Sequence, residues 1–183
     1  IVVFILFIIY DINSITWKDR ILHLSFYGAC TMIIVSTIIS LNEVDIIPVI
    51  IDSPTTVTVV FTALAIAAFI LLIYTLFIAL PFEETYIRFS DKPSVYDRGM
   101  YALCRHPGVI WFILFYVCIS IVVDDTEIWK MSGIYCLVDV LYVAFQDIWT
   151  FPRSFSNYDE YKTYTPFLIP NGKSIRRAFK TFR

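Results

Sequence analysis

Long apolar runs constrain the fold of this 183-residue chain more than any other feature of its sequence. Five such runs are separated by polar or proline-containing connections: Ile1–Tyr10, Ile21–Leu41, Thr56–Leu80, Val109–Val123 and Ile128–Ile148. A helix needs about 20 apolar residues to cross the hydrocarbon core of a bilayer, and each run except the first approaches that length. Hydrophobic residues make up 58% of the chain, more than a soluble domain requires. We therefore predict an all-α fold, a polytopic transmembrane helical bundle of about five spans whose first span is truncated.

Prolines and run lengths set the expected ends of these helices. Pro81 is expected to stop the third run and Pro152 the fifth, whereas Pro107 is expected to begin the fourth helix. Ile1–Tyr10 is expected to be the remainder of a truncated first helix and not a signal peptide, because no cleavage site follows it. Val44–Ile51 contains a proline and is too short to span, so it is expected to be interfacial or re-entrant.

Lysine and arginine alternate between rich and poor connections. Two lie between the first and second runs, none between the second and third, four between the third and fourth, one between the fourth and fifth, and seven after the fifth. This alternation matches the positive-inside rule for a multi-pass integral membrane protein with a cytoplasmic C-terminus. It also places residues 83–106 and 151–183 on the same cytoplasmic side, where they can meet.

Arg105-His106-Pro107-Gly108 stands directly before the fourth run. Proline is favoured at the first helical position, and the free N–H groups of the helix start attract anions. The guanidinium of Arg105 can bind a carboxylate or phosphate through two N–H groups. The segment therefore predicts an anion site where membrane meets water; the plainer alternative is a positively charged flank with a helix-starting proline.

Tyrosines recur at every third residue in a second polar stretch, at Tyr158, Tyr161 and Tyr164. This spacing places the three rings on one face of a short helix. The stretch ends in Pro166-Phe167-Leu168-Ile169-Pro170, which is expected to be extended. The alternative is an aromatic belt at the membrane interface.

The basic end of the chain, residues 172–183, carries Ile175, Phe179 and Phe182 at helical spacing. This pattern predicts a short amphipathic tail helix that lies on anionic lipid headgroups.

Together the two polar stretches resemble the family of integral-membrane methyltransferases that includes isoprenylcysteine carboxyl methyltransferases and bacterial phospholipid methyltransferases. The first matching pattern is Gly-x-Tyr-x-x-x-Arg-His-Pro at a helix start, here Gly99, Tyr101, Arg105, His106 and Pro107. After one helical hairpin comes Glu-Tyr-x-x-Tyr and a closing Ile-Pro, here Glu160, Tyr161, Tyr164, Ile169 and Pro170. The resemblance covers roughly residues 95–171, and the earlier runs match only as apolar spans.

We expect one membrane domain, 1–183, with N-terminal spans in 1–81 and the basic tail in 172–183, and the resemblance implies a methyltransferase-like catalytic half in 94–171. It implies a cytosolic C-terminal pocket for S-adenosylmethionine and a small lipophilic or lipid-borne methyl acceptor that arrives from the membrane. Catalytic roles fall to Arg105, Asp147 and Glu160. The implied cofactor-binding residues are Tyr101, Arg105, His106, Pro107, Gly108, Glu160, Tyr161 and Tyr164. Membrane lipids are expected partners, whereas nucleic acid and metal are not expected.

Two positions depart from the family pattern. Val109 stands where an aromatic residue is common, with Trp111 as a substitute, and Gln146-Asp147 replaces a pair of glutamates, which leaves Asp147 as the acidic counterpart. Two other functions stay open: an NADPH-dependent membrane reductase of the sterol-reductase type, whose family carries a similar Arg-His-Pro segment, and a non-catalytic membrane protein on the same scaffold.

Five further side chains are secondary candidates. Asp139 lies inside the fifth run and is either functional or hydrogen-bonded between helices. Glu83 and Glu84 face either the pocket or solvent. His23 is expected to be a packing contact. Cys104 has a cationic neighbour in Arg105, but we expect an unreactive thiol.

Overall fold

The computed structural model describes residues 2–51, 55–79 and 93–182, and every regular element in these ranges is helical. This confirms the all-α class for the described part of the chain. The elements in order are α1 (Val2–Ile15), α2 (Leu24–Glu43), α3 (Ile46–Ile51), α4 (Thr56–Ile73), the π-helical turn η1 (Tyr74–Ile78), α6 (Met100–Leu103), α7 (Pro107–Val123), α8 (Thr126–Phe145), the π-helical turn η2 (Gln146–Thr150), α9 (Phe151–Ser154), α10 (Tyr158–Tyr164) and α11 (Gly172–Thr181).

Three helical segments are long and apolar enough to cross a membrane: Leu24–Glu43, Thr56–Ile78 and Thr126–Ser154. Only 11 to 17% of the residues in their most apolar stretches are buried inside the protein, so lipid is the natural environment for the remainder. These helices indicate association with a membrane. The two other apolar helices are shorter, with 14 residues in α1 and 17 in α7, and the count of five spans stays a prediction.

Local capping explains where several helices begin. The side chain of Thr55 accepts a hydrogen bond from the backbone N–H of Thr58 at the start of α4, and the Asp125 carboxylate accepts from Glu127 and Ile128 at the start of α8. Pro107 occupies the first turn of α7, as its position in the sequence predicts. The short apolar segment after the second run forms α3, separate from the long helices.

Pro152 does not end the last apolar helix, contrary to the prediction. The helix widens into the π turn η2 and continues through α9 to Ser154, with Pro152 in the first turn of α9. The backbone N–H of Phe151 bonds to the carbonyl of Gln146, five residues back, so the hydrogen-bond register shifts before the proline. Proline is tolerated there because the first turn needs no N–H donor. The expected stop at Pro81 lies outside the described residues.

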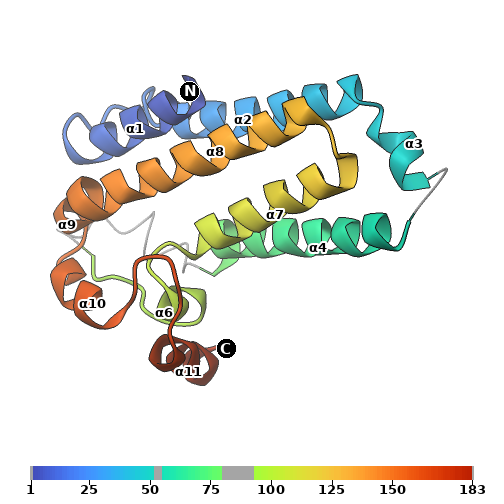
Figure 1. Ribbon diagram of the computed structural model, residues 1–183. Helices are drawn as coiled ribbons and strands as arrows, with labels where there is room; N and C mark the ends of the chain where they lie inside the picture. The colour runs from blue at the N-terminus through green and yellow to red at the C-terminus, as the bar shows by residue number, and fades with distance from the viewer. Residues whose placement is uncertain (1, 52–54, 80–92, 183) are drawn as a thin grey trace.

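The long helices run side by side, with α7 packed against α4 and α8, and with α1 packed against α2 and α8 (Figure 1). Buried Phe4 and Phe7 of α1 meet Tyr142 of α8, and the ring of Phe7 stacks on that of Tyr142 at 5.4 Å between centroids. Hydrogen bonds tie the helices together as well, including Thr37 to Tyr116 at 2.8 Å. Such bonds matter in lipid, where apolar contact between helices brings little net gain.

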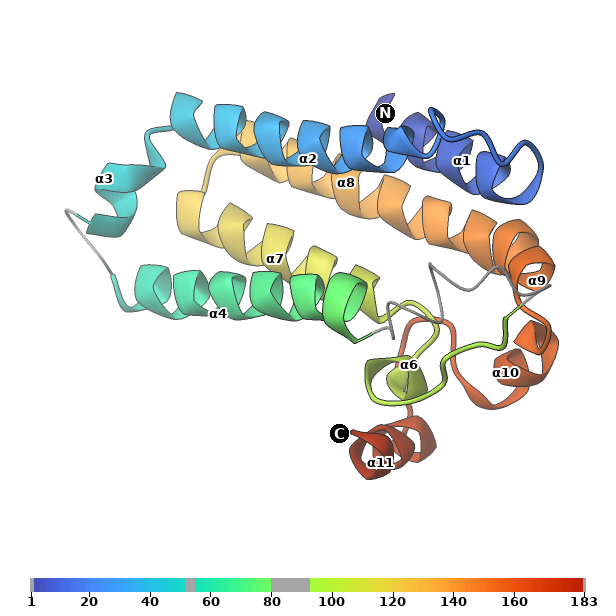
Figure 2. The same cartoon turned by 180° about the vertical axis from the view of Figure 1, so that it is seen from behind.

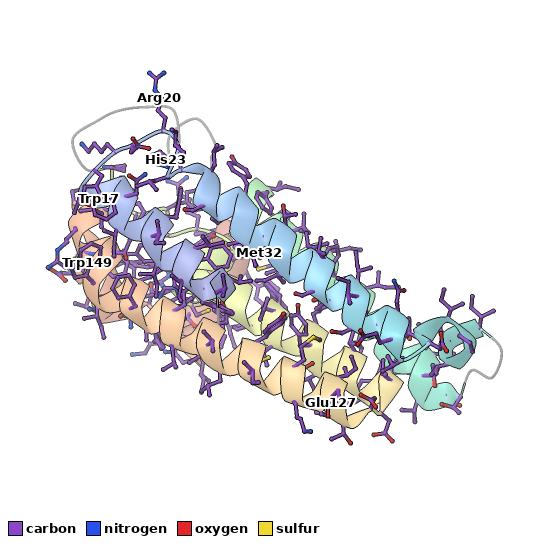
Figure 3. The ribbon with its side chains drawn as sticks, turned by 90° about the horizontal axis from the view of Figure 1, so that it is seen from above. Trp17, Arg20, His23, Met32, Glu127 and Trp149 are labelled. Carbon is purple, nitrogen blue, oxygen red and sulfur yellow. The ribbon has the colours of Figure 1, made fainter. Side chains whose placement is uncertain are left out.

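The connections divide between the two ends of the bundle. The α1–α2 connection, α9 and α10 lie at one end, whereas α3 and the α7–α8 turn lie at the other (Figures 1 and 2). Seen from above, Arg20 and Trp149 mark the first end and Glu127 marks the opposite one (Figure 3). The described connections that are rich in basic residues therefore share an end, as the positive-inside pattern requires.

We predict that the two ends are exposed on opposite sides of the membrane, with the Arg20 end inside the cell. In a variant whose four native cysteines are replaced by serine, single cysteines introduced by Glu43→Cys and Glu127→Cys should react with a membrane-impermeant maleimide in intact cells. Those introduced by Arg20→Cys and Asp159→Cys should react only after permeabilisation. All four positions are exposed, so accessibility within the protein does not bias the comparison. Equal labelling of both pairs in intact cells would contradict this orientation.

Candidate functional site

The segment that joins α6 to α7 is fixed by backbone contacts. The Arg105 N–H donates to the carbonyl of Pro166 at 2.9 Å, which ties the start of α7 to the extended segment after α10. Pro107 is buried and starts α7. A Cβ at Gly108 would lie 3.3 Å from the side chain of Leu76, so glycine allows α7 to approach the end of α4 closely. Pro107 and Gly108 thus position the site through the backbone.

The Asp147 carboxylate, in the π turn η2, is the centre of a cluster of polar side chains. Its Oδ1 accepts a hydrogen bond from the Tyr158 hydroxyl at 2.6 Å and lies 3.0 Å from Arg105 Nε and 3.4 Å from His106 Nε2. Its Oδ2 lies 3.7 Å from Lys162 Nζ. These five residues, which we call the Asp147 cluster, come from three separate segments of the chain.

The ion pair between Arg105 and Asp147 is buried, with side-chain exposures of 11% and 10%. The Nε–H of Arg105 is not directed at the carboxylate oxygen despite the short separation, and it has no hydrogen-bond acceptor among the described residues. The guanidinium lies over the ring of Phe167 at 5.6 Å from its centroid. The contact between Arg105 and Asp147 is therefore an ion pair without a directed Nε–H···O hydrogen bond.

His106 is enclosed by aromatic rings. Its imidazole stacks on Phe151 at 5.5 Å between centroids and meets the Phe167 ring edge-to-face at 5.2 Å. Burial lowers the pKa of His106 below its ordinary value of 6.5, and the nearby Asp147 carboxylate only partly opposes this effect. The imidazole is therefore neutral near pH 7, and the hydrogen bond to Asp147 requires its proton on Nε2.

Two buried tyrosines of α10 form hydrogen bonds that connect separate segments of the chain. The Tyr161 hydroxyl donates to the carbonyl of Tyr101 at 2.5 Å, and Tyr158 donates to Asp147 as described above. The pKa of both phenols is raised, mainly by burial, so both remain protonated at neutral pH. Burial likewise raises the pKa of the neighbouring Cys104 thiol to about 12, despite the Arg105 charge, which agrees with the expected lack of reactivity.

A second arginine, Arg177 of α11, reaches the same region. Its Nη2 donates to Thr165 Oγ1 at 2.6 Å and to the carbonyl of Ala102 at 3.2 Å, and its guanidinium stacks on Tyr164 at 4.5 Å. Its Nε–H is buried without an acceptor in the described part of the chain, as in Arg105. Sequence reasoning did not assign Arg177 to the site, because it stands among other basic residues of the tail.

The predicted residues divide into four groups. Tyr101, Arg105, His106, Asp147 and Tyr161 are joined by the contacts described above. Pro107 and Gly108 support the backbone, and Tyr164 lies at the edge, where its hydroxyl donates to Asp97 at 3.2 Å. Glu160 is exposed, and its carboxylate makes no hydrogen bond or ion pair with the described residues. The structure therefore does not bring Glu160 to the Asp147 cluster.

Sequence reasoning missed Lys162 and assigned no role to Tyr158 beyond its place on the tyrosine face. The signal for both was present: Tyr158 and Lys162 are four residues apart and so lie on one face of α10. The sequence does not predict that Asp147 lies opposite that face, because the π turn η2 determines the position of Asp147.

The positions that depart from the family pattern have structural roles. Val109 is buried, and Trp111 is half-buried with an indole N–H that has no acceptor among the described residues. Gln146 donates to the Tyr142 hydroxyl at 2.8 Å and so does not join the Asp147 cluster.

The remaining candidates lie elsewhere. Asp139 is half-buried in α8, and its carboxylate has no hydrogen bond or ion pair within the described ranges, so the alternative of a hydrogen bond between helices is not seen there. His23 makes a packing contact, edge-to-face with Tyr10. Glu83 and Glu84 lie outside the described residues. The described residues contain no group of three metal-ligating side chains.

No protein-family model, curated protein or solved structure matches this chain.

We predict that His106 makes the protein acid-sensitive. The folded state holds the imidazole neutral below its ordinary pKa of 6.5, whereas the unfolded state takes up a proton there. The free energy of unfolding should therefore fall as the pH drops below 6.5. Thermal unfolding in detergent between about pH 7.5 and about pH 5.5 should show a smaller loss for His106→Gln than for the parent.

The matched control is His23→Gln, because His23 and His106 are the two histidines of the chain. It should keep the acid sensitivity of the parent. An equal loss of stability in all three proteins would contradict the assignment to His106.

Proposed function

We propose that this protein transfers the methyl group of S-adenosylmethionine to a small lipophilic or lipid-borne acceptor at the membrane. The observation that carries the proposal is the convergence of the two motif segments. Arg105 and Tyr101 of the first segment contact Pro166 and Tyr161 of the second through the backbone bond at 2.9 Å and the phenol bond at 2.5 Å. The proposal includes a multi-pass topology with this end of the bundle in the cytoplasm.

The donor groups of the site suit the proposed cofactor. Arg105 and Arg177 each have a buried Nε–H without an acceptor among the described residues, and a cofactor carboxylate is an acceptor of the right charge. The guanidinium groups of Arg105 and Arg177 each cover one face of Phe167 and Tyr164, so a sulfonium cation attracted to these rings has to use the opposite faces. The cofactor, when bound, supplies an electrophilic methyl group.

The protonation states in the cluster favour some acceptors over others. Tyr158, Tyr161 and Cys104 hold their protons at neutral pH, so none of them is a ready base. A carboxylate acceptor needs no base, whereas an amine or a phenol must lose a proton. In the cluster, the neutral His106 imidazole and the Asp147 carboxylate are the groups that are able to accept one. The main task of the protein is then to orient the acceptor in line with the methyl group.

The ion pair also supports a second candidate, a non-catalytic membrane protein on the same scaffold. Asp147 already neutralises Arg105, and a site that keeps this pair closed binds no cofactor. The two candidates differ in whether an anionic ligand engages the buried Nε–H of Arg105 in place of Asp147.

Cofactor binding separates these candidates. We predict that calorimetry on the detergent-solubilised protein detects S-adenosylmethionine binding, and that Arg105→Gln weakens it by about tenfold or more, because a charge-assisted hydrogen bond is lost. Arg153→Gln is the matched control, since Arg153 lies at the same end of the bundle but is exposed and stacks on Trp149. It should leave the affinity unchanged.

Other outcomes point elsewhere. Binding of NADPH without S-adenosylmethionine would turn the assignment to a reductase. Binding of neither would leave the non-catalytic candidate.

A further inference from the structure

The tail helix α11 has three separate faces. One face packs on the protein and consists of Ser174, Arg177, Ala178 and Thr181. The other two faces are exposed: an apolar strip of Ile175, Phe179 and Phe182, and a basic strip of Lys173, Arg176 and Lys180. At 100° per residue the two strips are neighbours on the helix surface, on the side away from the packed face.

The packed face binds α11 to the candidate site. Arg177 donates to Ala102 and Thr165, as described above, and the backbone N–H of Gly99 donates to Thr181 Oγ1 at 3.0 Å. Gly99 has a φ of 55°, in the left-handed region that favours glycine, so this bond fixes the turn just before α6. The tail is therefore part of the scaffold that positions Tyr101 and Arg105.

The apolar strip lies beside the end of a helix that is long enough to span a membrane. The ring of Phe182 stacks on Tyr74 of η1, at 6.4 Å between centroids. Phe179 is 81% exposed. An exposed phenylalanine next to the end of a spanning helix is placed at the boundary between headgroups and acyl chains. In both ribbon views α11 lies beside α6, close to that end of α4 (Figures 1 and 2).

The basic strip supplies positive charge next to the apolar strip. Lys173 and Arg176 line an open surface hollow together with Asn171 and Gly172. The first N–H groups of the helix are already capped by the Asn171 side chain, so attraction to an anion comes from the Lys and Arg side chains. An apolar strip beside a basic strip matches an anionic bilayer surface, since the apolar strip can contact the acyl chains while the basic strip contacts the headgroups.

We propose that α11 lies in the membrane interface, with Phe179 and Ile175 among the upper acyl chains and the basic strip on anionic lipid headgroups. Because its third face holds Gly99, Ala102 and Thr165, the lipid surface stabilises the scaffold of the site. This inference does not depend on the reaction that the site performs. The competing occupants of the exposed strips are a second copy of the chain and a protein partner.

Hydrogen–deuterium exchange of the full protein in lipid nanodiscs tests the proposal. We expect the amides of residues 172–182 to exchange more slowly in a phosphatidylcholine–phosphatidylserine bilayer than in phosphatidylcholine alone. Arg176→Gln combined with Lys180→Gln should remove this difference, because each basic residue near an anionic surface adds about fivefold to binding. Phe179→Ala should speed exchange in both bilayers.

The control is Lys18→Gln combined with Arg20→Gln, which removes the same charge from exposed positions at the same end of the bundle. It should keep the difference between bilayers, while exchange in α4 and α7 reports that each variant is folded. Equal exchange in the two bilayers, or an equal loss in the control, would overturn the proposal. So would protection of the tail that rises with protein concentration, which would indicate a second copy.

Discussion

The Asp147 carboxylate determines where three separate segments of the chain meet. It binds Arg105 and His106 at the start of α7, and Tyr158 and Lys162 on α10, while it belongs to the last long helix itself. A carboxylate with 10% of its side chain exposed needs partners, because desolvation of an unpaired charge costs several kcal/mol. The positions of the α7 start and of α10 follow from that need.

The membrane and the site are linked through two departures from regular helix. The π turns η1 and η2 directly follow the long helices α4 and α8, and each supplies a contact of the site region. Tyr101 donates to the carbonyl of Thr75 in η1 at 3.0 Å, and η2 presents Asp147 to the cluster. A π turn carries one extra residue per turn and so rotates the side chains that follow it. The apolar helices thereby orient the polar residues at one end of the bundle.

Much of the architecture was predictable because it follows from local rules. Apolar runs give the long helices, Pro107 gives the start of α7, and the tyrosine period gives α10. The continuation of the last apolar helix beyond Pro152 was not predictable, since it depends on the shift of hydrogen-bond register in η2. Arg177 and Lys162 were missed for a related reason: their roles arise from contacts between distant segments, which no local spacing encodes. The exposure of Glu160 belongs to the same class, because it depends on which face of α10 turns toward Asp147.

A double-mutant cycle on Arg105→Gln and Asp147→Asn tests most directly whether their ion pair holds the segments together. Each single variant leaves a buried charge without its partner, so each should lower the free energy of unfolding by about 3 kcal/mol. The double variant removes both charges, and its loss should be clearly smaller than the sum of the single losses. Strictly additive losses would show that the two side chains act independently, and would contradict the central place given to Asp147.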